Sequence, residues 1–295
     1  MDKHKKASLI FLLLLIWMLF FEKILFKFIK YIFPVKFVVM LELNFSYQLI
    51  FIQVFVLLIF IVLYFIISKK SIKDTINIKK ISSKNILLVF LISIFMQPII
   101  MLINLMTSFF TDNVVGMQIA NSSRYPLLQL ILATAVFPPI LEETIFRGIL
   151  LKKYEKYSFW YGIILTSLFF GIMHLNLNQF FYTFFMGVVI SILVKITGSI
   201  FAGILCHSIV NGTQAITGYV LTKYATSSVI EIINNNILLS IILVLSVIIF
   251  SICMYIFVKV NRDRIKNNKE KVKIFNIYFI IDILIFVCVI ISQFL

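Results

Sequence analysis

Long apolar runs separated by short polar segments dominate the chain. Each run is close to the roughly 20 residues that a helix needs to cross a bilayer. Because a helix satisfies its own backbone hydrogen bonds in lipid, the pattern predicts an all-α, polytopic membrane bundle of eight or nine transmembrane helices. The runs lie at 7–21 (or 7–33), 47–67, 86–110, 126–151, 159–176, 178–197, 200–222, 237–258 and 274–294.

Composition supports a membrane protein and excludes several other classes. Hydrophobic residues make up 62% of the 295 residues and charged residues only 13%. Soluble domains are about half apolar and a quarter charged, so a soluble or a disordered chain is excluded. Three cysteines are too few for a disulfide scaffold, and all three fall in apolar runs, where we interpret them as small apolar residues.

The chain has a net charge of +15, and the positions of its basic residues favour a membrane protein over a nucleic-acid-binding protein. If the N-terminus is cytoplasmic, 20 of the 27 basic residues fall in cytoplasmic segments. This asymmetry follows the positive-inside rule and predicts a multi-pass protein of the cell membrane with a cytoplasmic N-terminus and an odd number of spans. The basic start, followed by an apolar run without a small-residue cleavage site, predicts an uncleaved signal-anchor.

Glycine is concentrated in one part of the chain. Eight of the nine glycines fall between Gly148 and Gly218. Small residues let membrane helices approach closely, so this region is expected to form a tightly packed core. We therefore divide the chain into N-terminal spans (1–125), a tightly packed core (126–222) and C-terminal spans (223–295), with the flanking spans facing lipid.

The same core carries ionisable and amide side chains, which are costly in a membrane and point to function. Glu143 and Arg147 are four residues apart and can pair on one helix face. Glu142 is rotated by about 100° and is free to face something else. Pro138-Pro139 should break or kink the fourth span and place Glu142 in the first turn of a new helix. The remaining candidates are Phe170 with His174, and His207 with Asn211, each pair again sharing one face; His4 lies in the basic N-terminal tail and is expected to be inert.

Together these groups have the chemistry of hydrolysis. Glu142 with a histidine can deprotonate a water molecule, while a second histidine and an amide donate hydrogen bonds to the developing oxyanion. Two histidines and one glutamate are also the ligand count of a catalytic zinc site, although no H-E-x-x-H motif is present. Taken singly, each residue also fits a structural role, as a buried ion pair or as a hydrogen bond between helices.

Three motifs in chain order resemble those of the CPBP (CaaX protease and bacteriocin-processing, Abi) family. They are Glu142-Glu143-x-x-x-Arg147, Phe170-x-x-x-His174 and His207-x-x-x-Asn211, within 126–222. The resemblance implies an intramembrane endopeptidase in which Glu142 and His174 activate water, and His207 and Asn211 stabilise the oxyanion. Glu143, Arg147 and Phe170 would support the site. The favoured mechanism needs no cofactor; the alternative is zinc held by Glu142, His174 and His207.

The expected partners are a peptide or membrane-protein substrate and the lipid bilayer, and no nucleic acid. The resemblance favours maturation of bacteriocin or pheromone peptides, or immunity to them. One alternative is a non-catalytic immunity or scaffold protein that binds a peptide or a partner in the same cavity. Another is a transporter with a Glu/His proton relay, which predicts an internal repeat that the sequence does not show.

Overall fold

The computed structural model describes residues 2–112, 116–117, 120–121, 125–154, 157–227, 235–265 and 276–294. Within these ranges every element is helical, which confirms the predicted all-α bundle. The elements are α1 (Lys3–Ile32), α2 (Val35–Leu43), α3 (Phe45–Ser68), α4 (Ile72–Thr75), α5 (Ser83–Phe95), α6 (Gln97–Ser108), α8 (Leu127–Ile131), η1 (Leu132–Val136), α9 (Phe137–Glu143), η2 (Thr144–Leu150), η3 (Leu151–Tyr154), α10 (Phe159–Met173), α11 (Leu177–Thr197), α12 (Ile200–Tyr224), α14 (Asn236–Val260), η4 (Arg262–Arg264) and α15 (Ile277–Ser292).

Seven helical stretches in the described residues are long and apolar enough to cross a bilayer, and α10 and α15 are shorter apolar helices. These nine helical segments coincide with the nine predicted runs, so the chain is a multi-pass membrane protein. The seven long stretches are Lys3–Phe21, Ser46–Ser68, Ser83–Ser108, Leu127–Tyr154, Leu177–Thr197, Ile200–Tyr224 and Asn236–Val260.

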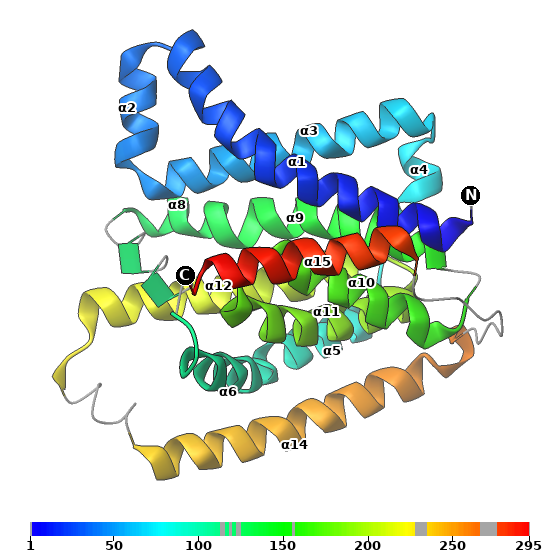
Figure 1. Ribbon diagram of the computed structural model, residues 1–295. Coiled ribbons are helices and arrows are strands. Elements are labelled where there is room, and N and C mark those ends of the chain that lie inside the picture. The colour runs from blue at the N-terminus through cyan, green and yellow to red at the C-terminus, as the bar shows by residue number, and fades with distance from the viewer. Residues whose placement is uncertain are drawn as a thin grey trace.

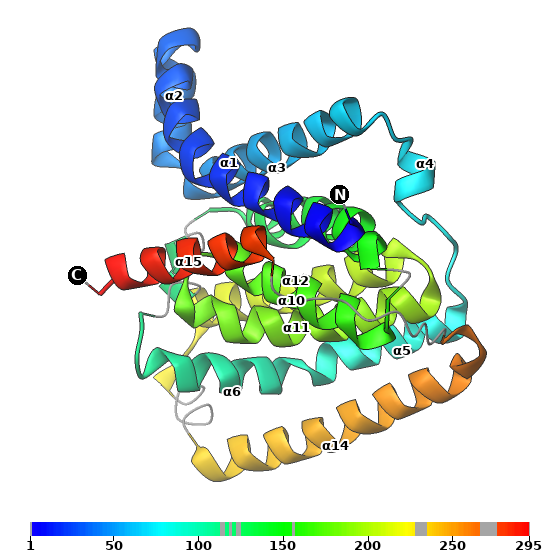
Figure 2. The ribbon, with the colours of Figure 1, turned by 45° about the vertical axis from the view of Figure 1, so that its right-hand side comes forward.

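The helices form layers around α9 to α12 (Figure 1). α1 and α3 cover one side of this centre, and α15 packs beside α1. α5 and α6 cover the other side, with α14 outermost against them, as the rotated view in Figure 2 also shows. The peripheral helices expose large apolar side chains, such as Ile66 on α3 and Leu245 on α14, which is typical of a lipid-facing surface.

Hydrogen bonds join the segments that the charge pattern assigns to the cytoplasm. These segments therefore lie together at one end of the bundle. The cytoplasmic location of that end remains a prediction. The linking bonds are Tyr157 Oη to Asp2 Oδ1 (2.8 Å), Ile200 N to Asn77 O (3.0 Å), Asn85 Nδ2 to Asn261 Oδ1 (3.1 Å) and Lys152 Nζ to the Asp74 carbonyl.

The fourth span is irregular around its two prolines. Pro138 and Pro139 have no N–H group, so neither can donate to the carbonyl four residues earlier. The chain absorbs them by π-helical turns, η1 before α9 and η2 after it, without ending the helix. The expectation that Glu142 lies in the first turn of a new helix is therefore wrong, because it is the sixth residue of α9 and lies in the second turn.

Two titratable side chains outside the core differ from expectation. His4 is buried within α1, 5% exposed, and its Nδ1 lies 3.3 Å from Asp2 Oδ2. It is thus part of the packed end of the bundle and not of a free tail. Asp282, which the motif analysis did not single out, is fully buried on α15. Ionisable groups are therefore buried in the flanking helices as well as in the core.

Candidate functional site

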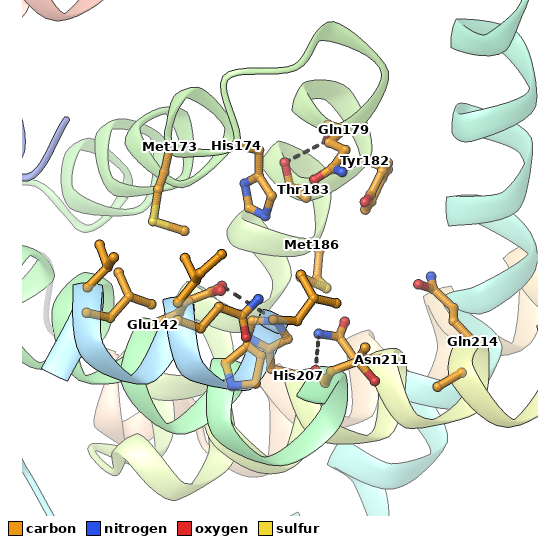
Figure 3. A pocket seen from close by; sticks show the side chains of 18 of the residues that line it. Glu142, Met173, His174, Gln179, Tyr182, Thr183, Met186, His207, Asn211 and Gln214 are labelled. Atoms are coloured by element: carbon orange, nitrogen blue, oxygen red, sulfur yellow. Dashed lines mark hydrogen bonds and ion pairs between the residues drawn. The ribbon is translucent and has the colours of Figure 1, made fainter. Parts of the chain in front are cut away.

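One cavity of about 400 Å³ contains all four residues predicted to be catalytic. Glu142 enters it from α9, His174 from the end of α10, and His207 and Asn211 from α12 (Figure 3). Helix α3 forms the opposite wall with apolar side chains and one amide. The structure therefore brings together four polar side chains that the sequence distributes over 70 residues. The α3 wall consists of Leu49, Ile52, Gln53, Val56 and Leu57.

A buried charge cluster centred on Glu143 supports the cavity from behind. Arg147 Nη1 donates to Glu143 Oε1 at 3.0 Å, which confirms the predicted pair, and Nη2 donates to the Gly187 carbonyl at 3.0 Å. His207 Nδ1 lies 2.8 Å from the same Glu143 oxygen. Because a carboxylate only accepts, the Nδ1 nitrogen donates. The cluster thus fixes the His207 ring.

Glu142 and Glu143 have different surroundings although they are neighbours in sequence. Glu143 is fully buried, whereas Glu142 lines the cavity, with its Oε2 atom 3.9 Å from His207 Nε2. Since Nδ1 of His207 faces one glutamate and Nε2 the other, its ring lies between them. The rotation of about 100° between adjacent helical residues produces this division, as the sequence predicted.

His174 is positioned by the turn that ends α10. Its Nδ1 lies 2.8 Å from the Phe170 carbonyl, which only accepts, so Nδ1 carries the proton and Nε2 keeps a free lone pair. Leu175 has a left-handed backbone (φ 48°), and Asn176 then caps α11 by accepting from Gln179 N. This tight turn directs the imidazole into the cavity (Figure 3).

Phe170 lies edge-on to both imidazoles. Its ring centroid is 5.2 Å from that of His174 and 5.7 Å from that of His207. The guanidinium carbon of Arg147 lies 4.7 Å from the same ring, within the range of a cation–π contact. The Phe170 ring therefore lies between the side chains of His174, His207 and Arg147 and keeps their surroundings apolar.

Asn211 satisfies a carbonyl that the prolines leave without a backbone donor. Its Nδ2 donates to Thr134 O at 2.9 Å. In a regular or π-helical turn that carbonyl would accept from residue 138 or 139, and both are prolines. One amide hydrogen of Asn211 thus holds η1 against α12, and the second is available to a molecule in the cavity.

Further polar residues line the cavity that the motif analysis did not include: Gln53, Thr134, Gln179, Tyr182, Thr183 and Gln214. Helical spacing could have identified Gln214, because it shares one face of the helix with His207 and Asn211 at i, i+4 and i+7. The others carry no comparable signal, since an isolated amide or hydroxyl is common near the end of a membrane helix.

The zinc alternative assigns Glu142, His174 and His207 as ligands. Among the described residues, no group of three or more His, Cys, Asp or Glu side chains is arranged to hold a metal ion. His207 directs Nδ1 to Glu143 and keeps Nε2 3.9 Å from Glu142, an arrangement that histidine ligands of metals also have. Zinc held by Glu142, His174 and His207 therefore stays a prediction.

Comparison with known proteins agrees with the geometry. Residues 124–213, which contain all three motifs, match the family model described as "Type II CAAX prenyl endopeptidase Rce1-like". A Bacillus subtilis (strain 168) protein named "Putative membrane peptidase YdiL" is 34% identical over 83 residues, which cover 28% of this chain and 34% of the relative. No solved structure matches the chain. These findings confirm the resemblance to the CPBP family in the central third of the chain.

Proposed function

We propose that the chain is an intramembrane endopeptidase that cleaves a membrane-associated peptide or protein with a water molecule activated by Glu142 and His174. The observation that carries the proposal is the single cavity that holds both groups together with two hydrogen-bond donors. The matches to a prenyl endopeptidase family and to a membrane peptidase support a protease over a transporter.

In this mechanism the Glu142 carboxylate accepts a proton from the water while the water oxygen attacks the scissile carbonyl carbon. The free Nε2 of His174 accepts a hydrogen bond from the same water and orients it. The tetrahedral oxyanion then accepts hydrogen bonds from His207 Nε2 and Asn211 Nδ2. Its collapse breaks the C–N bond, and Glu142 returns the proton to the leaving amine.

The buried charges fit a protonated His207 in this role. Two carboxyl groups, of Glu142 and Glu143, and one guanidinium, of Arg147, are buried around it. An imidazolium at His207 balances the cluster and provides the Nε2–H group that an oxyanion needs. Net balance matters here because an uncompensated charge is costly in a low-dielectric site.

The remaining lining favours an apolar peptide segment as substrate. Thioether and aliphatic side chains face the polar groups across the cavity, and methionine adapts to differently shaped ligands. This fits processing of a hydrophobic peptide, in maturation or in immunity, delivered from the bilayer. The apolar lining consists of Met18, Leu49, Ile52, Val56, Leu57, Leu130, Pro138, Met173, Met186 and Ala215.

Purified protein in liposomes, assayed with a panel of internally quenched apolar peptides, tests the proposal and the metal-free mechanism. After treatment with a chelator, and with metal content measured by mass spectrometry, we expect the cleavage rate to remain within about twofold of the untreated rate, because no step uses a metal. Activity that disappears with the metal and returns with zinc would contradict this mechanism. If the peptides bind without being cleaved, the alternative of a binding protein is supported.

A further inference from the structure

Lysines from three distant segments converge on Tyr64 at the end of the bundle that carries the predicted cytoplasmic segments. Lys153 of η3 donates from Nζ to the Tyr64 hydroxyl at 3.0 Å, and Nζ lies 5.5 Å from the centre of its ring. The ammonium group of Lys70, which follows α3, lies beside that of Lys153. Lys3 and Lys6 of α1 are near enough for their charges to act on Lys153, and that of Lys6 also acts on Lys70. We call these four lysines and Tyr64 the lysine cluster.

In the described part of the chain, no carboxylate pairs with Lys70 or Lys153. Asp74 uses its side chain on Ser71, whose Oγ donates to it at 2.6 Å. Asp2 accepts from Tyr157 Oη at 2.8 Å and faces His4. Asp74 and Asp2 are thus engaged elsewhere.

The positive charges of the lysine cluster therefore repel one another. The Lys153 charge is the main cause that lowers the pKa of Lys70, which lies outside the membrane-spanning segments. Neighbouring like charges raise the free energy of the folded state unless an anion screens them. Since the fold assembles the cluster from three segments, an anion bound there would offset this repulsion.

The position of the cluster indicates where that anion comes from. The apolar stretch of α3 ends at Ser68 and that of the fourth span at Tyr154, so Lys70 and Lys153 lie where the hydrocarbon layer ends. Lipid phosphates begin at this level. The hydroxyl of Tyr64 accepts from Lys153 and so keeps its own hydrogen for a phosphate oxygen.

We propose that the lysine cluster is a binding site for the phosphate of an anionic lipid headgroup. Lys70 and Lys153 make the direct contacts, Tyr64 donates a third hydrogen bond, and Lys3 and Lys6 add long-range attraction. Every residue of the cluster lies outside the cavity, so the site does not depend on the proposed peptidase activity.

Lipid binding to the purified chain tests the site without any substrate. Native mass spectrometry measures retention of phosphatidylglycerol against phosphatidylcholine for the wild type, for Lys70→Gln/Lys153→Gln and for Lys80→Gln/Lys84→Gln. The last variant removes the same charge from exposed lysines of the same predicted cytoplasmic segment and is the matched control. We expect the first variant to lower phosphatidylglycerol affinity by about tenfold or more and the control by less than about twofold.

A second arm, titration of the lipid-free protein with inorganic phosphate, separates the two sources of a phosphate group. Weak or no binding of free phosphate, with discrimination between the variants only for lipid, supports the proposal. Binding of free phosphate that depends on Lys70 and Lys153, without lipid selectivity, would overturn the headgroup as the source. Equal lipid affinities of the two double variants would overturn the site, and a thermal unfolding curve for each variant excludes misfolding as the cause.

Discussion

Glu142→Gln should lower the rate of peptide cleavage by about a hundredfold to ten-thousandfold, the range for loss of a general base. Glutamine keeps the size and the hydrogen-bonding capacity of the side chain but cannot accept the proton of the attacking water. Because Glu142 lines the cavity and is not the carboxylate that pairs with Arg147, the fold should survive. The measurement is the initial rate on an internally quenched peptide, at equal protein levels in liposomes.

Thr183→Val is the matched control for this prediction. Thr183 lines the same cavity, but its hydroxyl is used within α11 on the Gln179 carbonyl, so the change alters the wall without touching the proposed chemistry. We expect its rate to stay within a few-fold of the wild type. A Glu142→Gln protein that is folded and fully active would show that another group activates the water.

Arg147→Met should destabilise the protein by about 3–5 kcal/mol, the cost of removing one partner from a buried ion pair. Methionine fills a similar length but leaves the Glu143 carboxylate with His207 alone and the Gly187 carbonyl without its donor. Thermal unfolding in detergent, followed by circular dichroism, should show a markedly lower midpoint and a loss of activity together.

Lys223→Met provides a control that likewise replaces a cationic side chain by methionine, at an exposed position near the end of α12, and we expect little effect there. Two glycines of α12 give an independent check. A Cβ atom at Gly203 would lie 2.8 Å from Val194 Cγ2 and 2.9 Å from Glu143 Oε2, whereas one at Gly212 meets only Ala135 at an ordinary 3.5 Å. Gly203→Ala should therefore mimic Arg147→Met and Gly212→Ala should not; a reversed order would contradict the structural role of the Glu143 cluster.

The helical framework could be predicted because membrane helices are encoded locally. Each apolar run predicts its own span, and even the short interval between the runs 159–176 and 178–197 has a counterpart in the turn of residues 174–176 between α10 and α11. The pair of Glu143 and Arg147 was predictable for the same reason, since i, i+4 neighbours share a face in any helix. That Glu142, His174, His207 and Asn211 share one site was predicted from their joint presence in one glycine-rich core and from the family resemblance, because spacing within one helix carries no information about another.

The parts that could not be predicted depend on contacts between distant segments. Glu143 and His207 are 64 residues apart, and no periodicity relates them. The bond from Asn211 to Thr134 has a cause in the sequence, the two prolines, but its donor lies on another helix. Glu142 was misplaced because prolines usually end a helix, whereas here π-helical turns keep it continuous.

The proposed hydrolytic mechanism requires that water reach the cavity. In a background with Cys206, Cys253 and Cys288 replaced by alanine, Thr183→Cys places a thiol in the cavity, and Leu245→Cys places one on the exposed face of α14. Labelling of reconstituted protein with a membrane-impermeant methanethiosulfonate reagent compares the two. We predict rapid labelling at position 183 and none at position 245. A thiol at 183 as unreactive as the one at 245 would contradict a water-filled site within the membrane.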